Sequence, residues 1–135
     1  MKRTFIAALA LAALPLFANA PLFSRYENVR QAFLKNSLKD VQSSAAAFAA
    51  DARKAKLPTV AKEADAVAKS ADLAKARVAF AAVSESMIKL QSATKGARPA
   101  VYACPMIKKS WLQPKGQVGN PYDASMPMCG TLKAE

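Results

Sequence analysis

The apolar and polar residues of this chain alternate with helical spacing over most of its first hundred positions. Between Arg25 and Lys54 there is neither Pro nor Gly to interrupt a helix. Apolar residues recur there three and four positions apart, at Leu34, Leu38, Val41, Ala45, Phe48 and Ala52. Because residues at this spacing share one helix face, the pattern predicts a single long amphipathic helix over 25–54.

Two further helices are expected on the same grounds. A proline follows the first helix and disfavours a helical conformation in the residue before it, so the helix should end there. Thr59 is then expected to cap a short helix over 60–69, and Ser70 to cap a third helix. This third helix repeats the apolar spacing from Leu73 until Gly96 ends it, and it should return along the first.

The sequence changes character after Gly96, because Pro and Gly recur too often for a continuous helix. Short strands fit at Ala100–Cys104, at Ser110–Gln113 and near 130–133. We therefore expect a mainly α fold, built as an antiparallel bundle of two long helices and one short helix. A small loop-rich C-terminal cap over about 97–135, with a short β-sheet, completes it.

The helical patterns also predict the core. Ala is the commonest residue in these segments, so helix axes can approach closely, but each buried Ala removes little apolar area from water. The larger apolar and aromatic residues are therefore expected to supply most of the burial. They are Tyr26, Val29, Phe33, Leu34, Leu38, Val41, Phe48, Leu73, Phe80, Val83, Met87 and Leu90.

The first twenty residues have the order of a secretory signal peptide. A basic pair precedes an apolar run over 5–17, which ends in Ala18-Asn19-Ala20. The run has about 13 residues, whereas a membrane-spanning helix needs about 20. We expect 1–20 to be a signal peptide and 21–135 to be one exported domain of the periplasm or bacterial envelope. Pro21 fits poorly just after a cleaved bond, so the cleavage position is left open.

Charge and composition narrow the functional classes. The full chain has a net charge of +11, and residues 21–135, with eighteen Lys and Arg against nine Asp and Glu, have +9. The lysines are spread along helices without aromatic residues between them, so nucleic acid is not an expected partner. An acidic partner protein or an anionic membrane surface suits this charge outside the cytoplasm. The sequence has no His and no close pair of carboxylates suited to acid–base work, so we do not expect an enzyme.

The remaining chemistry is that of sulfur, which gathers in the C-terminal tail. Cys104 and Met106 form one group, and Met126, Met128 and Cys129 form a second. Two cysteines in an exported protein form a disulfide by default. Thiolates and thioethers are also soft ligands, which in the absence of imidazole favour Cu(I) or Ag(I) over zinc. The residues alone leave a disulfide and a soft-metal site as alternatives.

The tail also resembles a known family. The order Val101-Tyr102-Ala103-Cys104-Pro105-Met106, Trp111-Leu112-Gln113, Asn120-Pro121-Tyr122 and Met126 with Cys129-Gly130 is similar to that of a bacterial family of unknown function. Its domain is found alone as an exported protein and appended to periplasmic adaptor proteins of copper and silver efflux systems. The resemblance implies heavy-metal handling. It places Cys104, Met106, Met126 and Cys129 on the family's sulfur positions, with Met128 as an additional donor.

Two functions are therefore expected as alternatives. The first is a periplasmic protein that binds Cu(I) or Ag(I) and buffers the ion or passes it to efflux machinery, with the heavy-metal efflux adaptor as partner. The second is a non-enzymatic structural or interaction module of the envelope, with a Cys104–Cys129 disulfide and a basic helical face. In both, Tyr102, Trp111 and Tyr122 should form the body of the cap, and Asn120-Pro121 a turn.

Overall fold

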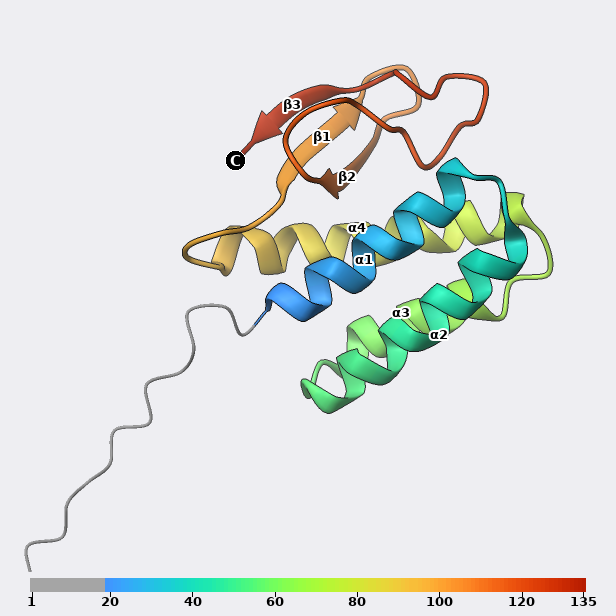
Figure 1. The fold of residues 1–135 in the computed structure, drawn as a ribbon, viewed down its shortest axis with the longest axis vertical. Helices are drawn as coiled ribbons and strands as arrows, with labels where there is room; N and C mark the ends of the chain where they lie inside the picture. Colours follow the sequence, from blue (N-terminus) through green and yellow to red (C-terminus); the bar gives the residue numbers. More distant parts are fainter. Residues whose placement is uncertain (1–18) are drawn as a thin grey trace, which may run out of the picture.

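A computed structural model describes residues 19–135, so the predicted signal peptide lies outside the described residues as far as residue 18. The described chain forms four helices followed by a three-stranded sheet (Figure 1). The elements are α1 (Ala20–Leu34), α2 (Leu38–Lys54), α3 (Pro58–Ala68), α4 (Leu73–Ala93), β1 (Ala100–Cys104), β2 (Lys109–Gln113) and β3 (Thr131–Ala134). The predicted fold class, mainly helical with a short C-terminal sheet, is confirmed.

The elements are arranged in three layers (Figure 1). Helix α4 runs antiparallel beside α1, and α2 and α3 pack as a hairpin on one side of this pair. The sheet lies on the opposite side, where β2 contacts α4 and α1. The C-terminal cap therefore covers the face of the α1–α4 pair that the α2–α3 hairpin leaves free.

The predicted helix over 25–54 is wrong, because the chain turns between α1 and α2. Asn36 adopts a left-handed backbone conformation with a φ of 53°, which Asn tolerates better than most residues. The Ser37 amide donates to the Ala32 carbonyl oxygen at 3.3 Å, and the Ser37 side chain accepts a hydrogen bond from the Asp40 amide at 3.2 Å. One helix thus ends and the next begins over residues 35–37 without Pro or Gly.

The starts of the later helices also differ from the predicted caps. Pro58 lies in the first turn of α3, where its missing amide hydrogen removes no helical hydrogen bond, so Thr59 lies inside the helix. At α4 the cap is Asp72 rather than Ser70, and its carboxylate accepts a hydrogen bond from the Lys75 amide at 2.8 Å. The hydrophobic pattern therefore located both helices more accurately than the candidate capping residues did.

The three strands lie where the C-terminal pattern predicts them. Strand β1 is central, and β2 and β3 pair with it on either side, both antiparallel. Tyr102 of β1 lies opposite Trp111 of β2 and Leu132 of β3. All four residues of β3 are exposed, whereas the last three residues of β2 are buried. The sheet is therefore attached to the helices mainly through β2.

Aromatic rings fill the space where α1, α2 and α4 meet. The centroid of the Phe80 ring lies 5.0 Å from the rings of both Tyr26 and Phe33. The Phe48 ring approaches Tyr26 edge-on, with 6.5 Å between centroids. Because all four rings are almost fully buried, they supply a large share of the apolar area that the helices remove from water.

The core differs from the predicted one in two respects. Four of the predicted leucines are only half-buried: Leu34, Leu38, Leu73 and Leu90. Leu34 and Leu38 flank the unpredicted turn, so they leave the shared face on which a continuous helix would place them. Conversely, Trp111 and Leu112 are fully buried although the tail has no helical pattern. The cap thus contributes side chains to the same core that the helices form.

Replacing Phe80 with Ala tests this core. The Phe80 ring is fully buried between Tyr26 and Phe33, so we expect Phe80→Ala to lower the free energy of unfolding by about 3–5 kcal/mol. Val78→Ala on the same helix is the matched control, because Val78 is 75% exposed and its truncation should cost less than about 0.5 kcal/mol. Urea unfolding followed by circular dichroism measures both. Equal effects of the two substitutions would contradict the packing described.

Candidate functional site

The two cysteines form a disulfide that closes the cap. Cys104 is the last residue of β1, and Cys129 lies shortly before β3; their Cα atoms are 5.2 Å apart. The Cys104 side chain is fully buried, and Cys129 is half-buried. The disulfide alternative of the sequence analysis is thus the form observed. Because both sulfurs are used in this bond, neither is a thiolate that could bind a metal ion.

The three methionines of the tail lie on the segments that this disulfide joins. Met106 follows Cys104 by two residues and is 75% exposed, and Met128 precedes Cys129 and is 60% exposed. Met126 is half-buried. Two of the four predicted sulfur ligands are therefore bonded to each other, while the thioethers remain available. Among residues 19–135, no group of three or more His, Cys, Asp and Glu side chains is placed to hold a metal ion.

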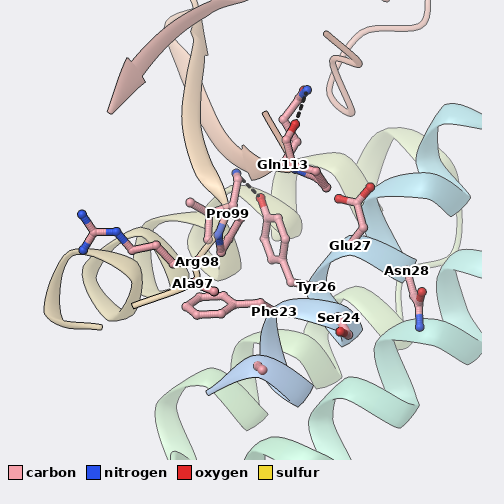
Figure 2. A pocket seen from close by; sticks show the side chains of 12 residues that line it. Phe23, Ser24, Tyr26, Glu27, Asn28, Ala97, Arg98, Pro99 and Gln113 are labelled. Atoms are coloured by element: carbon pink, nitrogen blue, oxygen red, sulfur yellow. Dashed lines mark hydrogen bonds between the residues drawn. The ribbon is translucent and has the colours of Figure 1, made fainter. Parts of the chain in front are cut away.

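Two tyrosines close the outer edge of β2. The Leu112 amide donates a hydrogen bond to the Tyr26 hydroxyl oxygen at 3.2 Å (Figure 2), and the Tyr122 hydroxyl lies 3.1 Å from the Ser110 carbonyl oxygen. Both tyrosine hydroxyls also bond to the Ser84 hydroxyl of α4, at 2.7 and 2.6 Å. These three side chains, Tyr26, Ser84 and Tyr122, form what we call the hydroxyl cluster. It joins β2 to α1, to α4 and to the loop that follows β2.

The hydroxyl cluster is poorly suited to acid–base chemistry. Burial raises the pKa of the Tyr26 phenol well above its usual range, and burial likewise raises the pKa of Tyr122. Both phenols therefore stay protonated at neutral pH. Their hydrogen bonds are directed to backbone groups of β2 and to Ser84, so the cluster holds structure together rather than activating a nucleophile.

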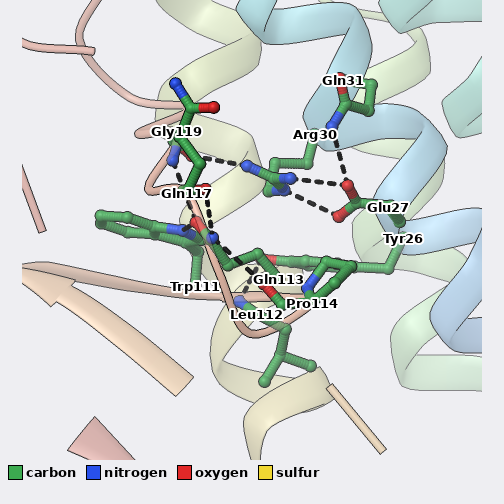
Figure 3. Close-up of polar contacts among 10 residues, drawn as sticks. All are labelled: Tyr26, Glu27, Arg30, Gln31, Trp111, Leu112, Gln113, Pro114, Gln117 and Gly119. Atoms are coloured by element: carbon green, nitrogen blue, oxygen red, sulfur yellow. Dashed lines mark hydrogen bonds and ion pairs between the residues drawn. The ribbon is translucent and has the colours of Figure 1, made fainter. Parts of the chain in front are cut away.

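The side chain of Gln113 organises the loop after β2 (Figure 3). Its oxygen accepts hydrogen bonds from Trp111 Nε1 at 2.9 Å and from the Gly119 amide at 3.1 Å. Its nitrogen donates to the Gln117 carbonyl oxygen at 2.9 Å. Gln113 is 1% exposed, and an unsatisfied amide at this depth would be costly. The polar groups of Trp111 and Gln113 are therefore used within the cap.

Arg30 of α1 binds the same loop (Figure 3). Arg30 is 4% exposed; its guanidinium pairs with both carboxylate oxygens of Glu27 at 2.6 and 2.7 Å and donates to the Gly119 carbonyl oxygen at 2.7 Å. A Cβ on Gly119 would lie only 2.7 Å from Arg30 Nη1, so a larger residue here would displace the guanidinium from its present position. Arg30 is not among the functional residues predicted from the sequence. An isolated Arg on a helix normally faces water, and no local pattern reveals a partner 89 residues away.

Asn120 and Pro121 form a turn that is fastened to the rest of the cap. The Tyr122 amide donates to the Asn120 side-chain oxygen at 2.9 Å, and the Asn120 side-chain nitrogen donates to the Met126 carbonyl oxygen at 3.2 Å. Arg77 Nε of α4 donates to the Pro121 carbonyl oxygen at 3.1 Å. Asn120 is 2% exposed, so its amide is enclosed by the loop that it organises.

The aromatic rings of the tail contact one another in a continuous row, with Tyr102 stacked on Trp111 and Trp111 edge-on to Tyr122. Ring centroids are 6.4 Å apart for Tyr102 and Trp111, 6.3 Å for Trp111 and Tyr122, and 5.8 Å for Tyr122 and Phe80 of α4. Trp111 is fully buried, and a Cβ on Gly130 would lie 2.7 Å from its ring. These rings therefore extend the helical core into the cap. Because Trp111 is fully buried, a cation from solvent cannot reach either face of its ring.

A cavity of about 390 Å³ lies between the start of α1, the segment 97–99 and the end of β2 (Figure 2). Phe23 and Pro99 are among its apolar lining residues. Its charged residues bind other protein groups: Glu27 pairs with Arg30, and Arg98 donates to the Thr94 carbonyl oxygen at 2.8 Å. The cavity is therefore an apolar hollow without a charged group free to act on a substrate.

The surface is dominated by lysines without carboxylate partners. Among the thirteen lysines of residues 19–135, Lys75 and Lys115 form ion pairs, with Asp72 and Glu135, and the other eleven form none. Within the same residues, no helix is long and apolar enough to cross a membrane. Uncompensated positive charge is therefore the main chemical feature that the described chain presents to its surroundings.

Comparisons with known proteins assign neither a family nor a function to this chain. No family model, no curated protein and no solved structure matches this chain. The resemblance of the tail to an exported family therefore stays a prediction.

Removing the disulfide tests how far it stabilises the cap. Cys104→Ser with Cys129→Ser opens a loop with a sequence separation of 25, and we expect the free energy of unfolding to fall by about 3.5 kcal/mol. Urea unfolding of the variant and the oxidised protein measures the difference, and reduction of the original protein should reproduce it. An unchanged free energy of unfolding in both experiments would show that the disulfide does not stabilise the folded protein.

Proposed function

We propose that this chain is a non-enzymatic interaction module of the bacterial envelope, in which a disulfide-closed cap and a basic surface bind an acidic partner surface. The observation that carries this proposal is the Cys104–Cys129 disulfide. It uses both thiols of the sequence, and exported proteins are the usual place for such bonds.

The internal hydrogen bonds of the cap support the same proposal. Gln113 and Asn120 are almost completely buried and bonded within the loop after β2, and the Tyr122 hydroxyl is bonded to Ser84. These side chains are the polar part of the tail's sequence motif. Since they are used to hold the cap, interaction with other molecules falls to exposed side chains, among which lysines are the most numerous charged residues.

The redox state of the cysteines in the cell tests the premise directly. Protein isolated from the envelope is alkylated before and after reduction, and its intact mass is measured. We expect no alkylation before reduction and two alkyl groups after it, because both thiols are paired. Two thiols that react without reductant would overturn the proposal in this form.

Binding to acidic surfaces tests the interaction itself. The oxidised protein is passed over immobilised poly-glutamate and mixed with vesicles that contain phosphatidylglycerol, with neutral phosphatidylcholine vesicles as control. We expect retention on an acidic surface that is lost as the salt concentration rises, since exposed charges are screened over about 10 Å at 0.1 M salt. Absence of retention on both acidic surfaces at low salt would contradict the proposal.

A second candidate function is the binding of Cu(I) or Ag(I), as the family resemblance implies. The observation in its favour is the exposure of Met106 and Met128, large apolar side chains on the two segments that the disulfide joins. Thioethers are soft ligands, so these methionines suit a soft monovalent ion. The predicted four-sulfur set additionally requires reduction of Cys104 and Cys129, because thiolates are the stronger ligands. On this proposal the reduced protein stores the ion or passes it to an efflux adaptor.

Competitive titration against a Cu(I) chelator tests this candidate. Reduced protein should bind one ion more tightly than micromolar, and the oxidised protein more weakly, because it offers thioethers alone. Met106→Leu with Met128→Leu should weaken the remaining binding of the oxidised protein, whereas Met87→Leu in the core is the matched control. Binding by the reduced protein no tighter than micromolar would rule out the metal function.

A further inference from the structure

A groove of about 450 Å³ runs between α4 and the cap, and none of its lining residues belongs to the apolar cavity already described. One wall is the outer face of α4, and the other is formed by the turn between β1 and β2 and by the loop 122–125. Tyr122, which is half-buried and belongs to the hydroxyl cluster, also lines it. The groove therefore lies between the helices and the cap, and residues of both line it.

The α4 wall of the groove is apolar where a surface helix is normally polar. Ala74 and Val78 line the groove and are exposed, Val78 to 75%, and the exposed Ala82 continues the same face of α4 one turn beyond the groove. Ile107, half-buried in the β1–β2 turn, lines the facing wall, and its neighbour Met106 is 75% exposed. The exposed Val78 on one wall, and Ile107 beside the exposed Met106 on the other, indicate a surface that another molecule covers.

The rim of the groove is predominantly basic. Lys108 in the β1–β2 turn and Lys109, the first residue of β2, are exposed without an ion pair among the described residues, and Lys109 and Arg77 line the groove. Arg77 is held rigidly, because it donates to Asn36 Oδ1 at 2.6 Å and to the Pro121 carbonyl oxygen at 3.1 Å. The one acidic lining residue, Asp123, accepts hydrogen bonds from the Ser125 amide and hydroxyl, at 2.8 and 2.6 Å.

We infer that this groove is the docking site for an acidic amphipathic helix of a partner protein, whose apolar face contacts Val78 and Ile107 and whose carboxylates face Lys108, Lys109 and Arg77. The inference rests on the proposed function and specifies its partner. Charge complementarity selects an acidic segment, and the apolar walls select one with an apolar face.

The shape of the groove favours a helix over a membrane surface. The exposed apolar face of α4 runs from Ala74 in the groove to Ala82, one turn beyond Val78, and extends about 12 Å at about 1.5 Å per residue, which matches two turns of a partner helix. The lining residues enclose a hollow of about 450 Å³, so a flat bilayer would contact the rims but would not fill it. An inserted helix can reach both walls at once.

A synthetic peptide serves as the probe. It has eighteen residues of leucine and glutamate arranged so that one helical face is apolar, and a scrambled peptide of the same composition is its control. Backbone amide chemical shifts of the oxidised protein are followed during titration. We expect the largest shifts at residues 74–78, 107–109 and 122–125, weaker binding as salt rises, and weaker binding of the scrambled peptide.

Substitutions on opposite ends of the molecule separate the groove from the overall charge. Val78→Glu should weaken the peptide at least about tenfold, and its exposed position leaves the fold intact. Lys108→Glu with Lys109→Glu should weaken it about tenfold. Lys54→Glu with Lys56→Glu, in and beside the α2–α3 turn on the side away from the sheet, changes the net charge equally and should weaken it less than about twofold (Figure 1). This control also matches the backbone, because Lys108 and Lys56 both have positive φ, at 52° and 60°.

The outcomes distinguish this inference from the proposed function. Shifts confined to the groove, with loss of binding in Val78→Glu, support both. Peptide binding that the two double substitutions weaken equally, or whose shifts lie elsewhere, overturns the groove as the site and leaves the proposed function standing. Binding to phosphatidylglycerol vesicles without binding to the peptide also overturns the groove as the site and leaves the proposed function standing. Failure to bind the peptide, poly-glutamate and the vesicles overturns both.

Discussion

The structure depends above all on how the polar edge of β2 is satisfied. An edge strand pressed against helices must find partners for its outward amide and carbonyl groups, or their burial costs more than the packing gains. Here the Tyr26 and Tyr122 hydroxyls supply those partners at Leu112 and Ser110, and Ser84 of α4 links the two tyrosines. The same tyrosine rings pack on Phe80, so one set of side chains joins the helical core to the cap both by apolar contact and by hydrogen bonds. This arrangement, with the Arg30 and Arg77 hydrogen bonds to the loop after β2, fixes the position of the cap on α1 and α4.

The remainder of the cap is built outward from that contact. Gln113, at the end of β2, fixes the following loop, Arg30 of α1 binds the Gly119 carbonyl oxygen, and the disulfide fastens the far end of the loop to β1. The Gln113 contacts are local in sequence, whereas Arg30 and the disulfide join segments 89 and 25 residues apart. A loop-rich segment with little regular structure thereby becomes an ordered surface, which is what a rigid binding face requires. The proposed function and the groove beside α4 both depend on this rigidity, because the groove's second wall belongs to the cap.

Periodicity along the chain predicts much of this fold, since helical spacing and the three short strands are local properties. Periodicity does not predict the turn at Asn36 between α1 and α2. This turn depends on the tolerance of Asn for a left-handed conformation and on Ser37, which caps the next helix. The long-range partners of Arg30 and Ser84 are not predicted for a different reason: their hydrogen bonds join segments that only the tertiary fold brings together. The choice between disulfide and metal site belongs to the same class, since spacing in sequence does not give the distance between Cys104 and Cys129 in space. The exposed apolar face of α4 likewise becomes visible only when the neighbouring cap is in place.

Native-state hydrogen exchange at the Leu112 amide tests most directly whether the hydroxyl cluster fixes the cap. This amide is fully buried and bonded to the Tyr26 hydroxyl rather than to a neighbouring strand. If the account is correct, it exchanges only through global unfolding, with the same free energy as the Val41 amide in the helical core, and Tyr26→Phe selectively removes this protection. Exchange of Leu112 at the rate of an exposed loop, while Val41 remains protected, would show that the cap opens independently of the helices and would contradict the account.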